Sequence, residues 1–247
     1  MGLIQDRGFV VFDHDDRTAL WAQAARHRAE VLSRDPQVRA ANLRHGKTWF
    51  VGVDLLPNDA TGAVDGVPLA GPWQDEVPDL AQHAAQVSIV YPGYPQQDAG
   101  QSAANHRFRV DRLAAHVDGL LPQGPDRRRY PGEFHAYILG LPLNDVPFAP
   151  TVVWKGSHRI MQDALRRAIG RADPRTVDVT EAYQAARAHV FNSCEIVPLK
   201  ARPGQAFLLH RFALHGTAPW QGPRRDGRMI AFFRPEFPDP RDWLTAV

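Results

Sequence analysis

The chain has 247 residues, of which 44% are hydrophobic and 23% charged, and these proportions are ordinary for a globular protein with a buried core. Its 29 Lys and Arg residues nearly balance its 27 Asp and Glu residues, so the charge does not indicate a nucleic-acid-binding surface. The single cysteine, Cys194, excludes internal disulfides and cysteine-based zinc or iron–sulfur sites.

The first segment of the chain predicts a strand followed by a helix. "GFVVF" (8–12) has the apolar character of a short strand, and residues 17 to about 33 repeat apolar residues at helical spacing. Asp13 or Asp16 is expected to accept the free N–H groups at the start of that helix. The opening "MGLIQD" lacks a signal-peptide core and a myristoylation serine or threonine, so we expect a cytoplasmic protein.

Residues 45–105 have a different character. Pro, Gly, Asp and Asn are dense there, which predicts long loops around the short strands "TWFVGV" and "QVSIVY". Because long ordered loops often carry or cover a site, we expect this segment to fold over it as a lid.

The second half of the chain predicts a mostly β protein. Two helices, at about 158–171 and 180–190, interrupt the strands without the strict alternation of a parallel α/β fold. We therefore expect one domain over 1–247, mostly β with flanking helices, built as a double-stranded β-helix (a cupin-like jelly roll). Its expected strands are 134–141, 151–154, 194–199, 205–210 and 228–233, each rich in β-branched or aromatic residues.

One short motif, "HVD", places His116 two positions before Asp118. A chain of this composition holds about one such pair by chance, so the pair alone indicates little. His215, at a glycine-containing corner in "LHGTAPW", supplies a third candidate ligand. Residues two apart on an extended chain point to the same side, so His116 and Asp118 can meet one ion while His215 arrives from a neighbouring strand. Two histidines and one carboxylate form the facial triad of non-heme Fe(II) oxygenases.

At this point the chain resembles the phytanoyl-CoA dioxygenase-like (PhyH) family of Fe(II)/2-oxoglutarate-dependent oxygenases. The resemblance spans nearly the whole chain and rests on features that occur in the family's order. These are "GFVVF" before a helix, "HVD", "HAYILGL" with the segment that runs to Gly156-Ser157-His158, "LHGTAPW", and an arginine in "GRMIAFFRPEF".

The resemblance implies a role for several residues. His116, Asp118 and His215 become the metal ligands, and Arg228 becomes the partner of the distal carboxylate of 2-oxoglutarate, for which a guanidinium fork is suited. Thr217 matches a family hydroxyl position that contacts this cosubstrate. Tyr137 lies one position along the sequence from the place of a family aromatic residue beside the cosubstrate. The implied cofactors are Fe(II), 2-oxoglutarate and O2. Family members that halogenate lack the carboxylate, so Asp118 favours hydroxylation of an unactivated C–H bond.

Several assignments have alternatives. His210 is a rival ligand but ends an apolar strand, where a hydrogen-bonded core histidine is commoner. Arg234 rivals Arg228 as the partner of the carboxylate, because both side chains point to the same face of one strand. They lie about 20 Å apart along that strand, so only one of them can bind the same carboxylate, and the family's spacing favours Arg228. Ser157 is expected either to cap a helix or to contact substrate, and Trp220 either to line the pocket or to pack in the core. The basic runs 126–130 and 223–228 suit an anionic substrate, but such loops are usually solvated.

Two other classes of function compete with an oxygenase. A zinc hydrolase can use the same His/Asp/His set with a metal-bound water, and a non-catalytic jelly-roll binding protein needs no turnover. The expected partner is a small-molecule substrate, with no nucleic acid and no membrane. A free metabolite is favoured over a coenzyme A thioester, because the phosphates of the thioester call for a basic docking surface. The sequence predicts neither the substrate nor the oligomeric state.

Overall fold

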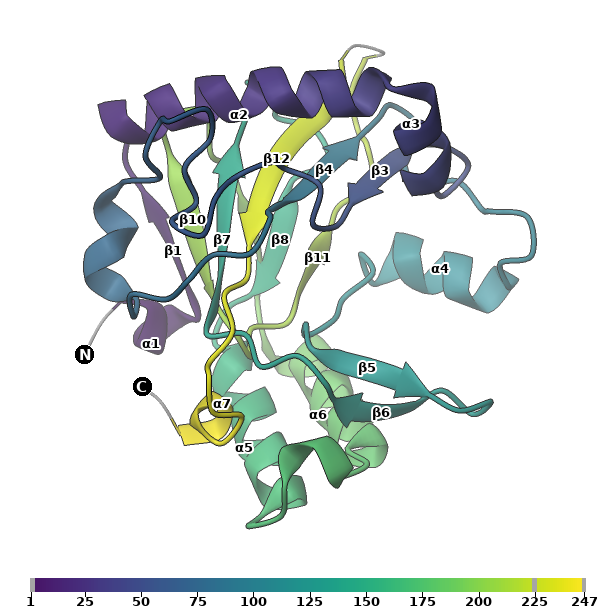
Figure 1. Ribbon diagram of the computed structural model, residues 1–247. Coiled ribbons are helices and arrows are strands. Elements are labelled where there is room, and N and C mark those ends of the chain that lie inside the picture. Colours follow the sequence, from purple (N-terminus) through teal and green to yellow (C-terminus); the bar gives the residue numbers. More distant parts are fainter. Residues whose placement is uncertain (1–2, 224–225, 246–247) are drawn as a thin grey trace.

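Two antiparallel sheets form the centre of the computed structural model, which describes residues 3–223 and 226–245 (Figure 1). The smaller sheet has the order β11 (His215–Thr217), β8 (Thr151–Trp154), β9 (Ile196–Leu199). A separate hairpin joins β5 (Leu120–Gln123) to β6 (Arg128–Pro131). The larger sheet has the order β1 (Phe9–Phe12), β10 (Ala206–His210), β7 (Tyr137–Pro142), β12 (Arg228–Phe233), β4 (Gln86–Val90), β3 (Trp49–Gly52), β2 (Leu43–Arg44).

The two sheets face each other across an apolar core. Ile138, Phe207 and Ile230 of the larger sheet pack in one cluster with Val153 and Leu199 of the smaller sheet. Four of the six neighbouring pairs in the larger sheet join strands that are not consecutive in the chain, as in a jelly roll. The expected fold class, a mostly β double-stranded β-helix with flanking helices, is confirmed.

The outer face of the larger sheet is covered by α2 (Asp16–Arg34), which lies across it in Figure 1. Trp21 and Ala25 of α2 pack in one cluster with Leu139 of β7. Asp15 caps this helix by accepting hydrogen bonds from the backbone N–H groups of Arg17 and Thr18. The expectation of a cap at Asp13 or Asp16 was therefore wrong, because the cap lies two residues after Asp13 and one residue before Asp16.

The helices α5 (Ser157–Ile169) and α6 (Thr180–Ser193) confirm the two helical stretches expected between strands. Sequence periodicity did not predict α3 (Pro36–Asn42) or α4 (Ala103–Asp111), because neither contains a buried residue and so neither shows an apolar stripe. The remaining short elements are α1 (Leu3–Arg7), α7 (Asp242–Thr245) and the 3₁₀ turns Pro72–Glu76 and Pro174–Thr176.

Segment 45–105 is dominated by loops around two short strands, as expected. The strands β3 and β4 extend the larger sheet beside β12, and the loop between them reaches the cavity described below through Asp54 and His83. Among the described residues, no helix combines the length and the apolar character needed to cross a membrane.

Candidate functional site

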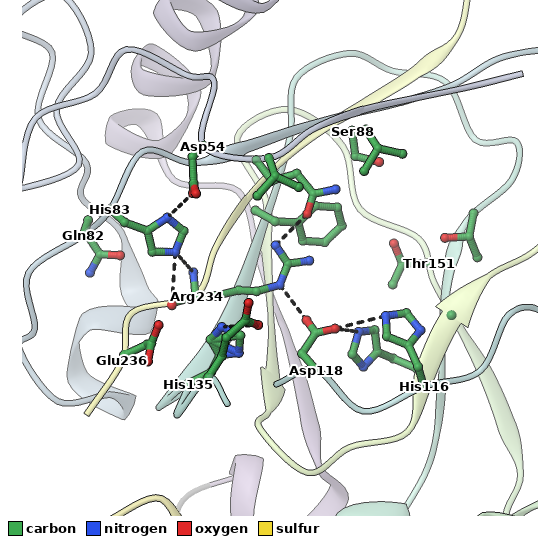
Figure 2. A pocket seen from close by; sticks show the side chains of 18 of the residues that line it. Asp54, Gln82, His83, Ser88, His116, Asp118, His135, Thr151, Arg234 and Glu236 are labelled. Atoms are coloured by element: carbon green, nitrogen blue, oxygen red, sulfur yellow. Dashed lines mark hydrogen bonds and ion pairs between the residues drawn. The ribbon is translucent and has the colours of Figure 1, made fainter. Parts of the chain in front are cut away.

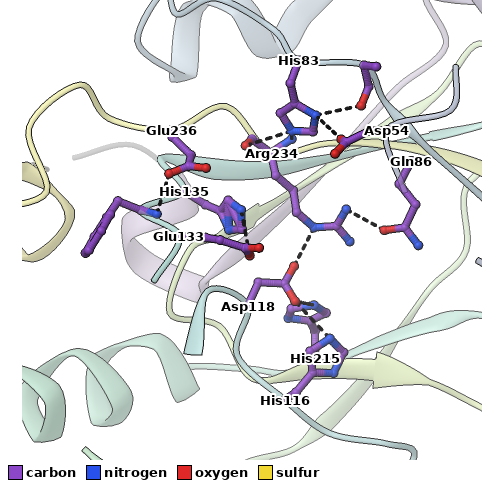
Figure 3. Close-up of polar contacts among 12 residues, drawn as sticks. Asp54, His83, Gln86, His116, Asp118, Glu133, His135, His215, Arg234 and Glu236 are labelled. Atoms are coloured by element: carbon purple, nitrogen blue, oxygen red, sulfur yellow. Dashed lines mark hydrogen bonds and ion pairs between the residues drawn. The ribbon is translucent and has the colours of Figure 1, made fainter. Parts of the chain in front are cut away.

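The structure brings His116, Asp118 and His215 together. His116 and His215 form an isolated antiparallel bridge in which each backbone N–H donates to the other's carbonyl, at 2.9 and 3.0 Å. Asp118 follows two residues later, so its side chain returns to the same side (Figure 3). One ligand atom from each residue lies within 4.8 Å of the others. The convergence expected from the spacing is confirmed.

Both histidines are oriented by the backbone. The Nδ1 of His116 lies 2.9 Å from the carbonyl of Ala114, and the Nδ1 of His215 lies 3.0 Å from the carbonyl of Ala213. A carbonyl only accepts, so each Nδ1 carries the proton and each Nε2 keeps its lone pair. These Nε2 atoms lie 3.0 and 3.7 Å from Asp118 Oδ1. Adjacent ligands of a metal bound at about 2.1 Å lie about 3 Å apart, so the donor set fits a metal ion.

The charges of the site also suit a metal. Burial works to raise the pKa of Asp118, but Arg234, His215 and His116 together hold it well below its usual range. Arg234 Nε donates to Asp118 Oδ2 at 2.6 Å, and its Nη1 donates to Gln86 Oε1 at 2.8 Å. Burial lowers the pKa of His215 to about 4. An anionic carboxylate and a neutral imidazole are the states in which these groups bind metals.

A cavity of about 710 Å³ contains the triad (Figure 2). It lies between the sheets, where residues two apart on β3, β4 and β12 point inward. Its size is within the range of small-molecule sites. Its lining includes Trp49, Val51, Gln86, Ser88, Thr151, Thr217, Phe232 and Arg234, and also the titratable residues Asp54, His83, Glu133, His135 and Glu236.

Arg228 is buried beside this cavity, with only 5% of its surface exposed. Its Nη1 donates to the hydroxyl of Thr151, which lines the cavity, at 3.4 Å. Within the described residues its Nε has no hydrogen-bond partner. Burial lowers its pKa to about 10. A buried, positively charged guanidinium that has one long hydrogen bond and an Nε without a partner favours binding of an anion.

The two other predicted cosubstrate residues lie in different places. Thr217 lines the cavity and pairs with Thr151 across the smaller sheet. Tyr137 packs in the cluster under α2, on the face of β7 opposite to Ile138, and its hydroxyl accepts a hydrogen bond from Gln82 at 3.2 Å. The structure therefore places Tyr137 outside the triad cavity, because neighbouring residues on a strand face opposite sides.

His210 is a core histidine in this structure and does not belong to the metal-ligand group. Only 2% of its surface is exposed, and its Nδ1 accepts a hydrogen bond from the backbone N–H of Phe212 at 3.1 Å. Burial, with repulsion from Arg211 and His158, lowers its pKa to about 2.

His210 makes the stability of the fold sensitive to acid. As the pH falls below about 6.5, the unfolded chain takes up a proton at this position while the folded chain does not. We therefore expect His210 to contribute a loss of about 1.4 kcal/mol in unfolding free energy per pH unit between pH 6 and 4. Urea unfolding of the wild type and of His210→Gln measures this contribution, and equal pH slopes for the two proteins would contradict the expectation.

The remaining candidates have structural roles or lie apart from the triad. Ser157 is buried and accepts from the backbone N–H of Leu214 at 2.8 Å, so it neither caps α5 nor faces the triad cavity. Trp220 packs against Phe148, with ring centroids 5.3 Å apart. In the first basic run, Arg128 pairs with Asp178 and Glu181. Residues 224 and 225 of the second run lie outside the described residues.

Sequence reasoning missed the polar groups around Arg234. His83 accepts a hydrogen bond from the backbone N–H of Arg234 at 3.3 Å, and its other ring nitrogen lies 3.0 Å from Asp54 (Figure 3). His135 is buried, and its pKa is lowered to about 4, chiefly by burial. No spacing in the sequence links these residues, so only the folded chain shows that they line the same cavity.

Gly216 lets the two histidine segments approach each other. A Cβ at this position would lie 2.1 Å from the carbonyl oxygen of Leu113, so Gly216→Ala pushes residues 113–116 away from β11. We expect Gly216→Ala to cost about 1–3 kcal/mol of stability and to weaken metal binding at least tenfold. Thermal unfolding and metal titration measure both effects, and an unchanged metal affinity would contradict this role for Gly216.

Comparison with known proteins finds solved structures that superpose on this chain. No family model and no curated protein sequence matches the chain. EvdMO1 superposes with a TM-score of 0.50 at 14% identity, over 96% of this chain and 49% of EvdMO1. EctD from S. alaskensis, solved with 2-oxoglutarate and 5-hydroxyectoine, gives a TM-score of 0.46 at 14% identity over 94% of this chain and 73% of EctD. HygX from Streptomyces hygroscopicus, solved with nickel and 2-oxoglutarate, gives a TM-score of 0.46 at 15% identity, over 95% of this chain and 85% of HygX.

Proposed function

We propose that the protein is an Fe(II)- and 2-oxoglutarate-dependent dioxygenase that hydroxylates an unactivated C–H bond of a small metabolite. The observation that carries this proposal is the convergence of His116, Asp118 and His215 in one cavity. Beside that cavity, the incompletely paired guanidinium of Arg228 donates to Thr151 of the cavity wall. Membership of the phytanoyl-CoA dioxygenase-like family stays a prediction from the motifs.

The residues of the chain divide the work. When bound, Fe(II) would couple two reactions: the O2-driven decarboxylation of 2-oxoglutarate to succinate and CO2, and the hydroxylation of the substrate. The two Nε2 atoms and the Asp118 carboxylate would hold the metal, and Arg228 would hold the distal carboxylate of 2-oxoglutarate, with Thr217 close by. Segment 45–105 forms a wall of the cavity and acts as its lid, which limits access of water to the reaction.

The rival functions explain fewer observations. A zinc hydrolase accounts for the triad but gives Arg228 no anionic partner. Because burying a charge without a counter-charge is costly, this function leaves the buried position of Arg228 unexplained. A non-catalytic binding protein has no need for two histidines whose Nδ1 atoms are tied to backbone carbonyls and whose Nε2 atoms face one carboxylate.

The test is succinate release from 2-oxoglutarate with Fe(II), ascorbate and a panel of compounds. The panel compares acyl-CoA esters, the matching free acids, and polar metabolites such as amino acids. We expect Fe(II)-dependent succinate formation that rises with a free metabolite. Ester hydrolysis with bound zinc and no succinate would support the hydrolase, and failure to bind Fe(II) would support the binding protein. Coupled turnover only with thioesters would overturn the free-metabolite preference.

A further inference from the structure

A second cavity, of about 440 Å³, adjoins the first at the triad. The two cavities share five lining residues: Trp49, His116, Asp118, Glu133 and Thr217. The walls of the second cavity come from α4, from the β5–β6 hairpin and from α6, which lie on one side of the molecule in Figure 1. A ligand in this cavity therefore lies beside the proposed metal site and apart from Arg228, which lines neither cavity.

Three arginines line this second cavity, one from each of those elements: Arg109 of α4, Arg129 of β6 and Arg187 of α6. None of them forms an ion pair with a carboxylate of the described residues, although Glu133 also lines the cavity. The second cavity is thus lined by three unpaired guanidinium groups and by two carboxylates, Asp118 and Glu133, of which Asp118 pairs with Arg234 outside this cavity.

The three guanidinium groups are held in place while most of their N–H donors stay free. Arg187 stacks on the rings of Phe108 and Tyr183, at 4.8 and 5.1 Å from the ring centroids. Arg109 lies over the Trp49 ring at 5.5 Å and donates one hydrogen bond, to Tyr94. Stacking fixes the plane of a guanidinium and leaves its edge available for an anion.

Two further observations point to an anionic ligand. The Nε of Arg109 is buried and has no hydrogen-bond partner among the described residues. Arg129 is half-buried and donates a hydrogen bond to the Leu120 carbonyl, and its pKa is lowered by burial and by repulsion from Arg127 and Arg187. Like charges brought together in a partly buried site repel one another, and an anion bound between them offsets that repulsion.

We propose that the substrate carries an anionic group, a carboxylate or a phosphate, which Arg109, Arg129 and Arg187 bind in the second cavity. This inference rests on the proposed function, because it makes the second cavity the substrate chamber of the same site. Anchoring there places the rest of the substrate against His116 and Asp118, where the reacting carbon must lie. The volume suits a small anionic metabolite and is small for a coenzyme A thioester.

The test measures binding of inorganic phosphate and of acetate to the metal-free protein by calorimetry at constant ionic strength. We compare the wild type with Arg187→Gln and with Arg129→Gln/Arg187→Gln. The matched control is Arg107→Gln, which removes the same charge from an exposed position on α4. We expect at least a tenfold loss of affinity in the double variant, a smaller loss in Arg187→Gln, and no change in the control. The tighter of the two probes identifies the anion.

Equal affinities in all four proteins, or an equal loss in Arg107→Gln, would overturn the proposal. Arg187 forms no hydrogen bond within the described residues, so Arg187→Gln keeps the test usable if the double variant unfolds. Because the assay contains neither iron nor 2-oxoglutarate, its result is independent of the oxygenase assignment. Absence of succinate in the activity assay counts against the proposed function, whereas absence of anion binding here counts against the substrate chamber alone.

Discussion

Loss of iron-dependent turnover is the expected result of His116→Ala, Asp118→Ala and His215→Ala. The three ligand atoms form the one group of potential metal donors found among the described residues, so a variant that lacks one of them has no spare donor. We expect succinate formation to fall to background and bound iron, measured by elemental analysis, to fall with it. Folding is checked by thermal unfolding of the metal-free proteins.

The three variants are expected to differ in stability. Asp118→Ala leaves the half-buried guanidinium of Arg234 without its carboxylate, which typically costs about 3–5 kcal/mol for a buried pair and less for this partly exposed one. The side chain of His116 is 46% exposed, so His116→Ala is expected to cost little.

His210→Ala is the matched control for the ligand assignment. It removes a buried histidine that lies outside the triad, so we expect a loss of about 1–3 kcal/mol in stability and retention of bound iron. If His215→Ala keeps full activity while His210→Ala loses it, the ligand assignment is wrong.

Arg228→Met is expected to raise the 2-oxoglutarate concentration needed for half-maximal turnover by about 30- to 4,000-fold. Removing one partner of a desolvated ion pair costs about 2–5 kcal/mol, and each 1.4 kcal/mol corresponds to about tenfold in affinity. Iron binding is expected to stay intact, because Arg228 contacts none of the three ligands. The stability of the metal-free protein is expected to hold or rise, since methionine removes a buried charge without leaving a carboxylate unpaired.

Arg234→Met distinguishes the role of Arg234, which follows β12, from that of Arg228 at the start of β12. Arg234 donates to Asp118 and Gln86, so its loss is expected to weaken iron binding and stability while changing the 2-oxoglutarate requirement little. Titrations of both variants with iron and with 2-oxoglutarate distinguish the two roles. The reverse ordering of the 2-oxoglutarate requirements would make Arg234 the carboxylate partner.

Much of the fold was predictable from local pattern. The strands β8, β9, β10 and β12 fall within the β-branched and aromatic runs that predicted them, and β7 extends one residue beyond its predicted run. The helices α3 and α4 were not predictable, because they bury no residue and their sequences carry no periodic apolar signal. The cap of α2 was misplaced among three neighbouring aspartates, since only backbone geometry shows which carboxylate meets the free N–H groups.

The site was predictable where spacing along a strand carries the information. The two-residue step from His116 to Asp118 predicted their common side, and the even separation of Arg228 and Arg234 predicted a common face. Tyr137 shows the limit of this reasoning, because an uncertainty of one residue moves a strand side chain to the opposite face. The ion pair between Arg234 and Asp118 joins residues 116 positions apart, and it follows from strand order, which the sequence did not predict.

The most direct measurement is a crystal structure of the protein grown without oxygen in the presence of Fe(II) and 2-oxoglutarate. We expect one iron bound by Nε2 of His116, Nε2 of His215 and a carboxylate oxygen of Asp118, with the 2-oxo acid end of 2-oxoglutarate on the metal and its distal carboxylate on Arg228. A metal bound by other residues, or a triad metal with no 2-oxoglutarate beside it at saturating concentration, would contradict the account.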